Sequence, residues 1–552
     1  MANWDEVADL VIIGSGGGAL TAALVAHRAG ATPLVLEKAD RFGGSTAMSG
    51  GVLWLPANPV LERSGGHDTI EAGRAYLNAL IDDDERSPAR SRREAFLQAV
   101  RPMVRMLEAE TLRFYACEGY SDYYDELPGG RGSGRAIGAR MISAKRLGDL
   151  ADRLMLLPGW NAPVKTDEFA QLSLAGRTLG GKLMAARVAA RSIRQRLDGA
   201  PLYYRGAALQ ARMLLSARRR GIDLRSGTQV TELISDEGRI VGVRVAVSGR
   251  PEKRIGARLG VLAASGGFAR NAMLRERFQQ QPVGTKWTMA SPGDTGDMII
   301  EGMRHGAAVE TMAESWWLPM SLKANGAIAG FHSPQEMQKP FCIAVDSRGE
   351  RFVNEAASYM EIGQAMYARN AIPAWIIMDA RHRRFYPWGA VPPGVTPSSW
   401  LKSGYLKRAD TLADLAAQCG IDAQGLVRTV VRFNAFAASG LDEDFKRGAR
   451  AYDRCYADPR VSPNPALGAL EQAPFDAIAI VPGDVGTAGG LATDEHAQVL
   501  REDGAVIKGL YACGNCAAPL FGSHYPGPGA SIAASFAFGY IAARHAVGAN
   551  AD

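Results

Sequence analysis

A glycine-rich turn near the start of the chain has the residue types and spacing of an anion-binding loop. Gly14, Gly16 and Gly18 follow an apolar run and precede an Ala-rich one. Gly14 permits a tight turn and Gly16 lets the backbone approach a pyrophosphate, while Ala19 holds the third position, where a small residue lets a helix pack closely on a strand. The backbone N–H groups of such a turn, at the positive end of a helix dipole, would face the phosphates. The spacing predicts a dinucleotide site.

A carboxylate stands where the ribose of that nucleotide would be bound. Glu37 ends a second apolar run, residues 33–37. In dinucleotide-binding folds an acidic side chain about 20 residues after the glycine turn accepts hydrogen bonds from the ribose. Because a glycine turn alone is weak evidence, Glu37 is what favours a nucleotide site, and it favours a ribose without a 2′-phosphate.

The elements that must position these residues follow from hydrophobic patterning. Residues 10–13 predict a buried parallel strand, and the Ala-rich run to Ala29 predicts a helix. Residues 258–267 predict another buried strand, which returns the chain to the nucleotide. The other predicted elements are a hairpin within 222–247, a helix opened by a capping box at Asp68 to Glu71, and helices at about 90–109, 411–419 and 424–438.

Composition excludes several classes of protein. The 552 residues are 47% hydrophobic and 22% charged, as in a globular protein, and the net charge of +6 is too thin to imply a nucleic-acid partner. The acidic start leaves no room for a signal segment, and residues 530–543 are too short to span a membrane. Six cysteines make no disulfide framework, so we expect a cytoplasmic location.

Two further motifs decide which nucleotide is bound. Gly43-Gly44-Ser45-Thr46 and residues 509–515, which end at Asn515, resemble the flavin loops of the fumarate reductase flavoprotein superfamily. The resemblance implies FAD, with Asn515 bonded to the ribitol chain. No histidine follows Gly43-Gly44, so we expect the FAD to be non-covalent. The residues expected to bind it are Gly14, Ser15, Gly16, Gly18, Ala19, Glu37, Lys38, Gly43, Gly44, Ser45, Thr46, Gly50, Gly51, Val230, Ser265, Gly266, Gly514, Asn515, Ala530 and Ile532.

Nearly the whole chain resembles the 3-ketosteroid Δ1-dehydrogenases of that superfamily. The matching stretches are residues 42–51 with Trp54 and Pro56, 120–124, Trp316-Trp317, 349–355 with Tyr359, 442–445 and 525–529. The family removes a proton from carbon 2 of a 3-ketosteroid and passes a hydride from carbon 1 to the flavin. The partners implied are therefore a 3-ketosteroid and an electron acceptor that the sequence does not identify, for which a quinone is one candidate.

The resemblance assigns catalytic roles to four residues. The Tyr525 hydroxyl and the Gly529 N–H would polarise the 3-keto oxygen, as preorganised donors to the developing enolate. Tyr359 would take the carbon-2 proton. Because free tyrosine titrates near 10, this base needs a neighbouring donor, for which we favour Tyr123, with Tyr120 and Tyr124 as its rivals.

Three alternatives stay open at this stage. The related 4-(5α)-dehydrogenases share the keto-binding tyrosine. Cys513 and Cys516 form a CxxC motif that would suit a flavin-dependent disulfide oxidoreductase, although no second nucleotide domain follows. A fumarate reductase would need cations where this chain has neutral aromatic motifs. The histidines show no metal-binding spacing, so we expect no metal.

The predicted fold class is α/β, a Rossmann-like FAD-binding domain interrupted by an inserted α+β catalytic domain. We expect the FAD-binding domain at residues 1–280, with a helical excursion at about 66–205, the catalytic domain at 281–480, and a return to the FAD-binding domain at 481–552. Within the excursion, residues 182–196 form a basic amphipathic helix. It predicts either a solvated surface helix or a weak peripheral membrane contact.

Overall fold

A sheet with a parallel core carries the predicted nucleotide-binding loops, and we call this part of the protein the nucleotide-binding half. The structure is a computed structural model that describes residues 4–82, 88–157, 162–332 and 335–548. Within them the larger sheet has eight strands, and its parallel core runs in the order β21, β11, β1, β2, β8. The strands are β1 (Glu6–Ile13), β2 (Pro33–Leu36), β8 (Asp223–Arg225), β11 (Lys253–Ala263), β20 (Gln498–Leu500), β21 (Val506–Ala512) and the hairpin of β9 (Thr228–Asp236) and β10 (Arg239–Val247).

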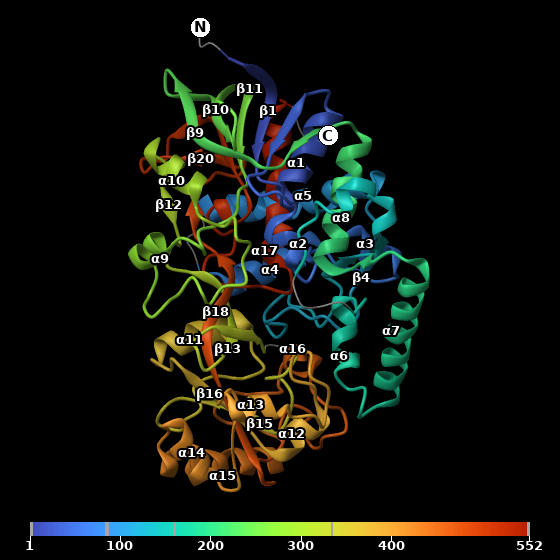
Figure 1. Cartoon of the computed structure of the whole chain (residues 1–552), viewed down its shortest axis with the longest axis vertical. Helices are drawn as coiled ribbons and strands as arrows, with labels where there is room; N and C mark the ends of the chain where they lie inside the picture. Colours follow the sequence, from blue (N-terminus) through green and yellow to red (C-terminus); the bar gives the residue numbers. More distant parts are fainter. Residues whose placement is uncertain (1–3, 83–87, 158–161, 333–334, 549–552) are drawn as a thin grey trace.

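Two helices from opposite ends of the sequence pack together beside this sheet (Figure 1). They are α1 (Gly17–Arg28) and the last helix, α17 (Ala530–Ala546). A Cβ on Gly18 would lie 2.4 Å from the Ser535 carbonyl oxygen, and one on Gly539 would lie 2.1 Å from that of Gly18. Small residues therefore set the close approach of the two helices. Also in this half are α5 (Pro88–Ala109), α8 (Arg205–Arg219), α9 (Ala272–Phe278), α10 (Asp297–Arg304), β12 (Val309–Glu310) and β19 (Gly490–Leu491).

A second, antiparallel sheet lies below the first in Figure 1. Its central strand β18 (Phe475–Thr487) is long, and the figure shows it running up toward the nucleotide-binding half. The other strands are β13 (Ser315–Leu322), β14 (Ile328–Phe331), β15 (Cys342–Val345), β16 (Ala374–Met378) and β17 (Lys407–Ala409). The helices around it are α11 (Tyr359–Ala368), α12 (Ala380–Phe385), α13 (Ser398–Lys402), α14 (Leu412–Cys419), α15 (Ala423–Ser439) and α16 (Ala451–Cys455).

The segment between β2 and β8 includes the predicted excursion at about 66–205 and contains short strands as well as helices. It contains α2 (Gly44–Met48), α3 (Pro59–Arg63), α4 (Ile70–Leu80), α6 (Phe169–Leu172), α7 (Leu179–Asp198), β3 (Val52–Trp54), β4 (Phe114–Ala116), β5 (Ala136–Ala139), β6 (Ile142–Ser143) and β7 (Leu202–Tyr203), besides α5 and α8. The cap of α4 is Thr69, whose side chain accepts a hydrogen bond from the Ala72 N–H. Asp68 was expected there, but its carboxylate is buried and paired with Arg135 instead.

The α/β fold class and most predicted elements are confirmed. The hairpin turns at Glu237 and Gly238, and the helices expected at 90–109, 411–419 and 424–438 are α5, α14 and α15. In the described ranges, no helix combines the length and the apolar character that crossing a bilayer requires.

Candidate active site

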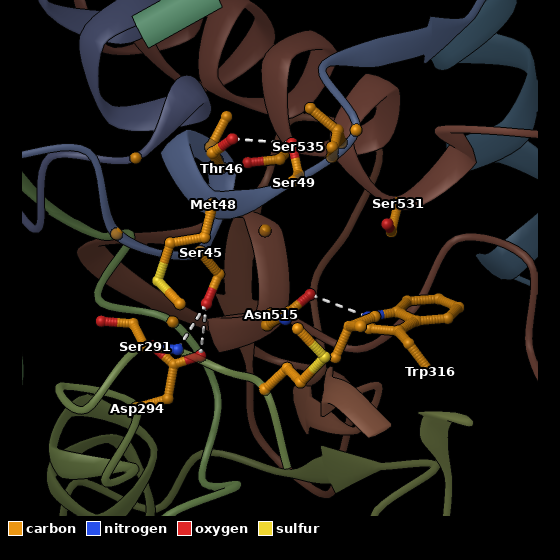
Figure 2. A pocket seen from close by; sticks show the side chains of 18 of the residues that line it. Ser45, Thr46, Met48, Ser49, Ser291, Asp294, Trp316, Asn515, Ser531 and Ser535 are labelled. Carbon is orange, nitrogen blue, oxygen red and sulfur yellow. Dashed lines mark hydrogen bonds between the residues drawn. The ribbon is translucent and has the colours of Figure 1, made fainter. Parts of the chain in front are cut away.

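A large cavity opens where the carboxyl ends of the parallel strands meet the second sheet. Its wall includes Gly14 at the end of β1, Glu37 after β2, Ala264 after β11 and Leu318 of β13. About 2090 Å³ of space within it, including its mouth, is free of atoms. The predicted nucleotide loops and the second sheet therefore line one cavity. Figure 2 shows polar side chains from several segments converging on it.

The glycine turn presents bare backbone to the cavity. Gly14 has a φ of +102°, and its Cβ would lie 2.4 Å from the Ala264 carbonyl oxygen, so only glycine fits. A Cβ on Gly16 would meet nothing closer than the Thr46 hydroxyl at 3.6 Å, and one on Gly44 would meet nothing within 4 Å. Both glycines line the cavity, so side chains there would fill the space that a pyrophosphate needs.

Ser15 links the three nucleotide-binding segments. Its hydroxyl donates a 2.6 Å hydrogen bond to the Glu37 carboxylate and accepts one of 2.8 Å from the Gly43 N–H. The other Glu37 oxygen accepts a bond from the Ala39 N–H. Burial raises the pKa of Glu37. Glu37 therefore holds the two loops together as well as lining the cavity where a ribose is expected.

Asp294 is a cavity residue that the sequence did not reveal. Its carboxylate accepts a 3.1 Å hydrogen bond from Ser45, whose hydroxyl accepts one from the Ser291 N–H (Figure 2). Burial raises the pKa of Asp294 to about 7. A Cβ on Gly266 would lie 2.4 Å from an Asp294 oxygen. The local sequence signal at this position is a Gly- and Pro-rich turn at residues 291–297.

Asn515 is oriented by an aromatic residue of the second sheet. The Trp316 indole N–H donates a 2.9 Å hydrogen bond to the Asn515 amide oxygen (Figure 2). Because the amide oxygen is the acceptor of this bond, the NH₂ group of Asn515 is a hydrogen-bond donor on its other side. From the sequence, Trp316 was only one of the residues that match the dehydrogenase motifs. In the structure it lines the cavity.

Twenty residues were expected to bind FAD, and most of them line the cavity. Four do not: Gly18 and Ala19 lie in α1 behind the turn, Gly43 is the N-cap of α2, and Ala530 is buried in the first turn of α17. A direct contact of these four residues with FAD stays a prediction. Those that line it are Gly14, Ser15, Gly16, Glu37, Lys38, Gly44, Ser45, Thr46, Gly50, Gly51, Val230, Ser265, Gly266, Gly514, Asn515 and Ile532.

The three predicted catalytic tyrosines come from three separate parts of the chain and converge at the wall of this cavity. The ring centre of Tyr359 lies 5.7 Å from that of Tyr123 and 5.3 Å from that of Tyr525, and the last two are 5.8 Å apart. Of the two rivals for the helper role, Tyr120 bonds to the Thr166 carbonyl oxygen, and Tyr124 is not part of the cavity wall. Tyr123 is therefore the member of the 120–124 loop that adjoins Tyr359.

The electrostatics of Tyr359 differ from the expectation of an assisted base. Burial raises the pKa of Tyr359 well above its usual value, and that of Tyr123 likewise. The neighbouring Tyr123 and Tyr525 raise the pKa of Tyr359 further. One feature acts in the opposite direction: Tyr359 is the first residue of α11, where the positive end of the helix dipole favours a phenolate.

The predicted keto-binding pair lies at the start of α17. The Tyr525 hydroxyl is 3.0 Å from that of Ser531. Gly529 is the N-cap of α17 with a φ of +86°, and its Cβ would lie 2.0 Å from the Val52 carbonyl oxygen. In the described part of the chain, no acceptor bonds to the Gly529 N–H. This N–H and the Tyr525 hydroxyl are thus donors at the cavity wall.

A buried charge cluster fixes the loop that carries Tyr123. Asp122 accepts hydrogen bonds from the Trp54 indole at 2.7 Å and from Arg135 at 2.6 Å. Arg135 also pairs with Asp68, and all of these side chains are buried. Because a buried charge left without its partner is costly, this cluster strongly favours one loop conformation.

Two further tyrosines line the cavity and were missed. Tyr452 and Tyr456 are four residues apart at α16, so they share one face of a helical turn. The Tyr452 ring centre lies 4.2 Å from that of Tyr123, and its buried hydroxyl has no partner among the described residues. The i, i+4 spacing was the signal that could have revealed them.

The CxxC alternative finds no support in the geometry. Cys513 and Cys516 are buried, and burial raises the pKa of both thiols, so little reactive thiolate forms at neutral pH. Within the described residues, no group of three His, Cys, Asp or Glu side chains lies close enough to hold a metal ion.

Residues 9–532 match the family described as FAD binding domain. The chain belongs to this family and is an FAD-binding flavoprotein. It is also 40% identical over 560 residues to a 3-oxosteroid 1-dehydrogenase of Mycobacterium tuberculosis, which covers 97% of this chain and 98% of that protein. The chain therefore belongs to the family of 3-ketosteroid Δ1-dehydrogenases, as the resemblance in its motifs implied.

Solved structures agree with this assignment. The 3-ketosteroid Δ1-dehydrogenase of Sterolibacterium denitrificans, in complex with 1,4-androstadiene-3,17-dione, matches with a TM-score of 0.90 at 34% identity, over 99% of this chain and 100% of that one. The 3-ketosteroid Δ4-(5α)-dehydrogenase of Rhodococcus jostii matches with a TM-score of 0.68 at 22% identity, over 99% and 98%. This second likeness is one of fold alone, so the 4-(5α)-dehydrogenase alternative is the weaker match.

Proposed function

We propose that this flavoenzyme introduces a double bond between carbons 1 and 2 of 3-ketosteroids, converting a 4-ene-3-ketosteroid to a 1,4-diene. The single observation that carries the proposal is the convergence of Tyr123, Tyr359 and Tyr525 in the cavity that the nucleotide loops also line. FAD, when bound, supplies the chemistry of accepting the hydride from carbon 1. The protein's own residues bind and orient the steroid and move its carbon-2 proton.

Binding of the keto group is the proposed task of Tyr525 and Gly529. Their hydroxyl and N–H donors would hold the 3-keto oxygen and stabilise the negative charge that develops on it. Polarising the carbonyl also makes the carbon-2 proton more acidic. Because the Gly529 backbone is fixed by its fit against Val52, this donor needs no rearrangement as the charge develops.

Removal of the proton is the proposed task of Tyr359. Its oxygen would accept the carbon-2 proton, and the adjacent Tyr123 hydroxyl would donate a hydrogen bond to the phenolate form. Since burial raises the pKa of Tyr359, the phenolate is scarce in the free enzyme. We propose that the dipole of α11 and the donors of the tyrosine cluster stabilise it while steroid is bound.

Anaerobic bleaching of the flavin tests the proposal directly. A 4-ene-3-ketosteroid added without any electron acceptor should reduce the bound FAD and abolish its visible absorbance in one turnover. A flavin that stays oxidised with every 3-ketosteroid would contradict it. The FAD should also be released by acid, because no histidine lines the cavity among the described residues.

The setting of the enzyme is part of the same proposal. Six free cysteines support a reducing, cytoplasmic compartment. We propose a diffusible oxidant such as a quinone as the electron acceptor and a lipid surface as the source of the steroid. We also propose residues 281–480 as the catalytic domain, with the exception of α10 and β12, which pack in the nucleotide-binding half.

A further inference from the structure

Helix α7 stands at the outer edge of the protein and presents a full face to solvent (Figure 1). Its buried residues are Gly181, Met184 and Val188, and the last two pack in a small cluster with Val164. Phe169 and Leu172 of α6 lie against that cluster. At 20 residues, the helix is about 30 Å long.

The solvent face of α7 carries a continuous apolar stripe. Leu179, Leu183, Ile193 and Leu197 are 74%, 63%, 58% and 82% exposed. At 3.6 residues per turn they lie within an arc of about 80°. Ala186 and Ala190, which are also exposed, fill the middle of that arc. So large an apolar face on one surface helix is characteristic of an interaction site.

Cations flank this stripe on both sides. Lys182 and Arg196 lie along one edge, and Arg187 and Arg194 along the other, by the same helical geometry. Asp198 is the one carboxylate of the helix, and it lies 3.7 Å from Arg194. In the described ranges, Lys182, Arg187 and Arg196 have no carboxylate at ion-pair distance.

Arg191 differs from the four flanking cations because it pairs with a carboxylate inside the protein. Its guanidinium turns inward and makes hydrogen bonds of 2.6 and 2.7 Å to Glu168. Among the described residues, the four flanking cations have no such inward partner, and the Asp198 carboxylate near Arg194 is itself at the surface. They are available for an anionic surface, which the exposed apolar stripe would also contact.

We propose that this face of α7 (the α7 stripe: Leu179, Leu183, Ile193 and Leu197, with the four flanking cations) docks on an anionic lipid surface. The helix would lie in the plane of the interface, with its apolar residues among the acyl chains and its cations at the headgroups. Along the stripe, the apolar residues and the alanines between them alternate at spacings of four and three residues. This pattern would also suit a helix pair with a second copy of the chain. That pairing would bring like charges together along both edges, so the charges favour lipid.

The position of α7 indicates what the docking would be for. This step rests on the proposed steroid substrate. Phe169 packs against the inner face of α7 and also lines the catalytic cavity. Thr166 and Leu157 line the cavity as well. Among the described residues, Phe169 of α6 thus connects the inner face of the lipid-facing helix with the cavity. A steroid dissolved in the membrane would therefore reach the cavity beside α7 without crossing bulk water.

Vesicle flotation of the FAD-bound full-length protein tests the proposal. The charge variant carries Lys182→Glu, Arg187→Glu and Arg196→Glu, and the apolar variant replaces the four stripe residues with serine. The control is Val431→Ser with Leu441→Ser, which are 66% and 71% exposed in the α15 region. The wild type and the control should float with phosphatidylglycerol-containing vesicles at low salt and not with pure phosphatidylcholine. The charge variant should bind about 100-fold more weakly, at about fivefold for each lost cation.

Several outcomes would overturn the proposal. These are absence of wild-type flotation, flotation of both α7 variants like the wild type, or a wild-type dimer that the apolar variant converts to a monomer without any lipid binding. A second assay separates the docking proposal from the proposed function. When the steroid is supplied in detergent, the flavin of every variant should be bleached as in the wild type. Steroid supplied in anionic vesicles should be turned over several-fold more slowly by both α7 variants. Flotation of a protein that no steroid reduces would uphold the docking surface and contradict the proposed function.

Discussion

The backbone N–H of Tyr123 donates a 3.0 Å hydrogen bond to the carbonyl oxygen of Pro526, the residue that follows Tyr525. The Tyr76 hydroxyl donates a second bond, of 2.6 Å, to the same oxygen. The loop of the proposed helper and the loop of the proposed keto donor are therefore tied together in the free protein. Such preorganisation lets binding energy serve the reaction rather than the ordering of loops.

Tyr359→Phe should fold, bind FAD and lose turnover by at least about 100-fold, the usual contribution of a positioned acid or base. The substitution removes only the oxygen proposed to accept the proton. Steady-state kcat on a 4-ene-3-ketosteroid measures the effect, and flavin absorbance shows that the cofactor is still bound. Tyr124→Phe, in a tyrosine outside the cavity wall, is the matched control. A Tyr359→Phe enzyme with wild-type kcat would place the base elsewhere.

Tyr525→Phe should lower turnover by roughly 100- to 1,000-fold, the cost of losing one preorganised donor to an oxyanion. The ring remains, so its contacts with Trp316 and Tyr123 should be kept. Both kcat and kcat/KM should fall together, because the lost bond is strongest in the transition state. Tyr511→Phe, whose hydroxyl contacts His545, serves as the control. A change confined to KM would mean that Tyr525 binds ground state and transition state equally.

Asp294 should make the stability of the FAD-free protein depend on pH. Burial raises the pKa of its carboxyl from 3.8 to about 7, so between those values the folded state binds a proton that the unfolded state has lost. The free energy of unfolding should therefore fall as pH rises from about 4 to about 7, by up to about 4 kcal/mol from this group at 1.36 kcal/mol per pH unit.

Urea unfolding at several pH values compares the wild type with Asp294→Asn. The variant cannot titrate at this position, so its free energy of unfolding should decline less steeply across that range. Identical slopes for the two proteins would show that Asp294 ionises normally. Asp444→Asn, at a surface carboxylate whose pKa is lowered by Arg432, should not flatten the decline.

The nucleotide half of the site could be predicted well because its signals are local. The glycine turn, the strand before it and Glu37 lie within one short stretch, and each has a direct physical requirement for its residue type. The tyrosine roles came from family motifs instead, since nothing local tells a catalytic tyrosine from a buried one. Asp294 and Tyr452 were missed because a Gly- and Pro-rich turn and an i, i+4 tyrosine pair are weak local signals. Their place in the site comes from folding, which brings them against Ser45 and Tyr123.

The product of the reaction tests the central claim most directly. The wild-type enzyme should be given a 4-ene-3-ketosteroid with an artificial electron acceptor, and in parallel the 5α-saturated analogue, and the products identified by mass and ultraviolet spectra. The account predicts a 1,4-diene from the first steroid, with the new double bond between carbons 1 and 2. Turnover of the saturated analogue alone, to a 4-ene, would contradict it and assign the enzyme to carbons 4 and 5.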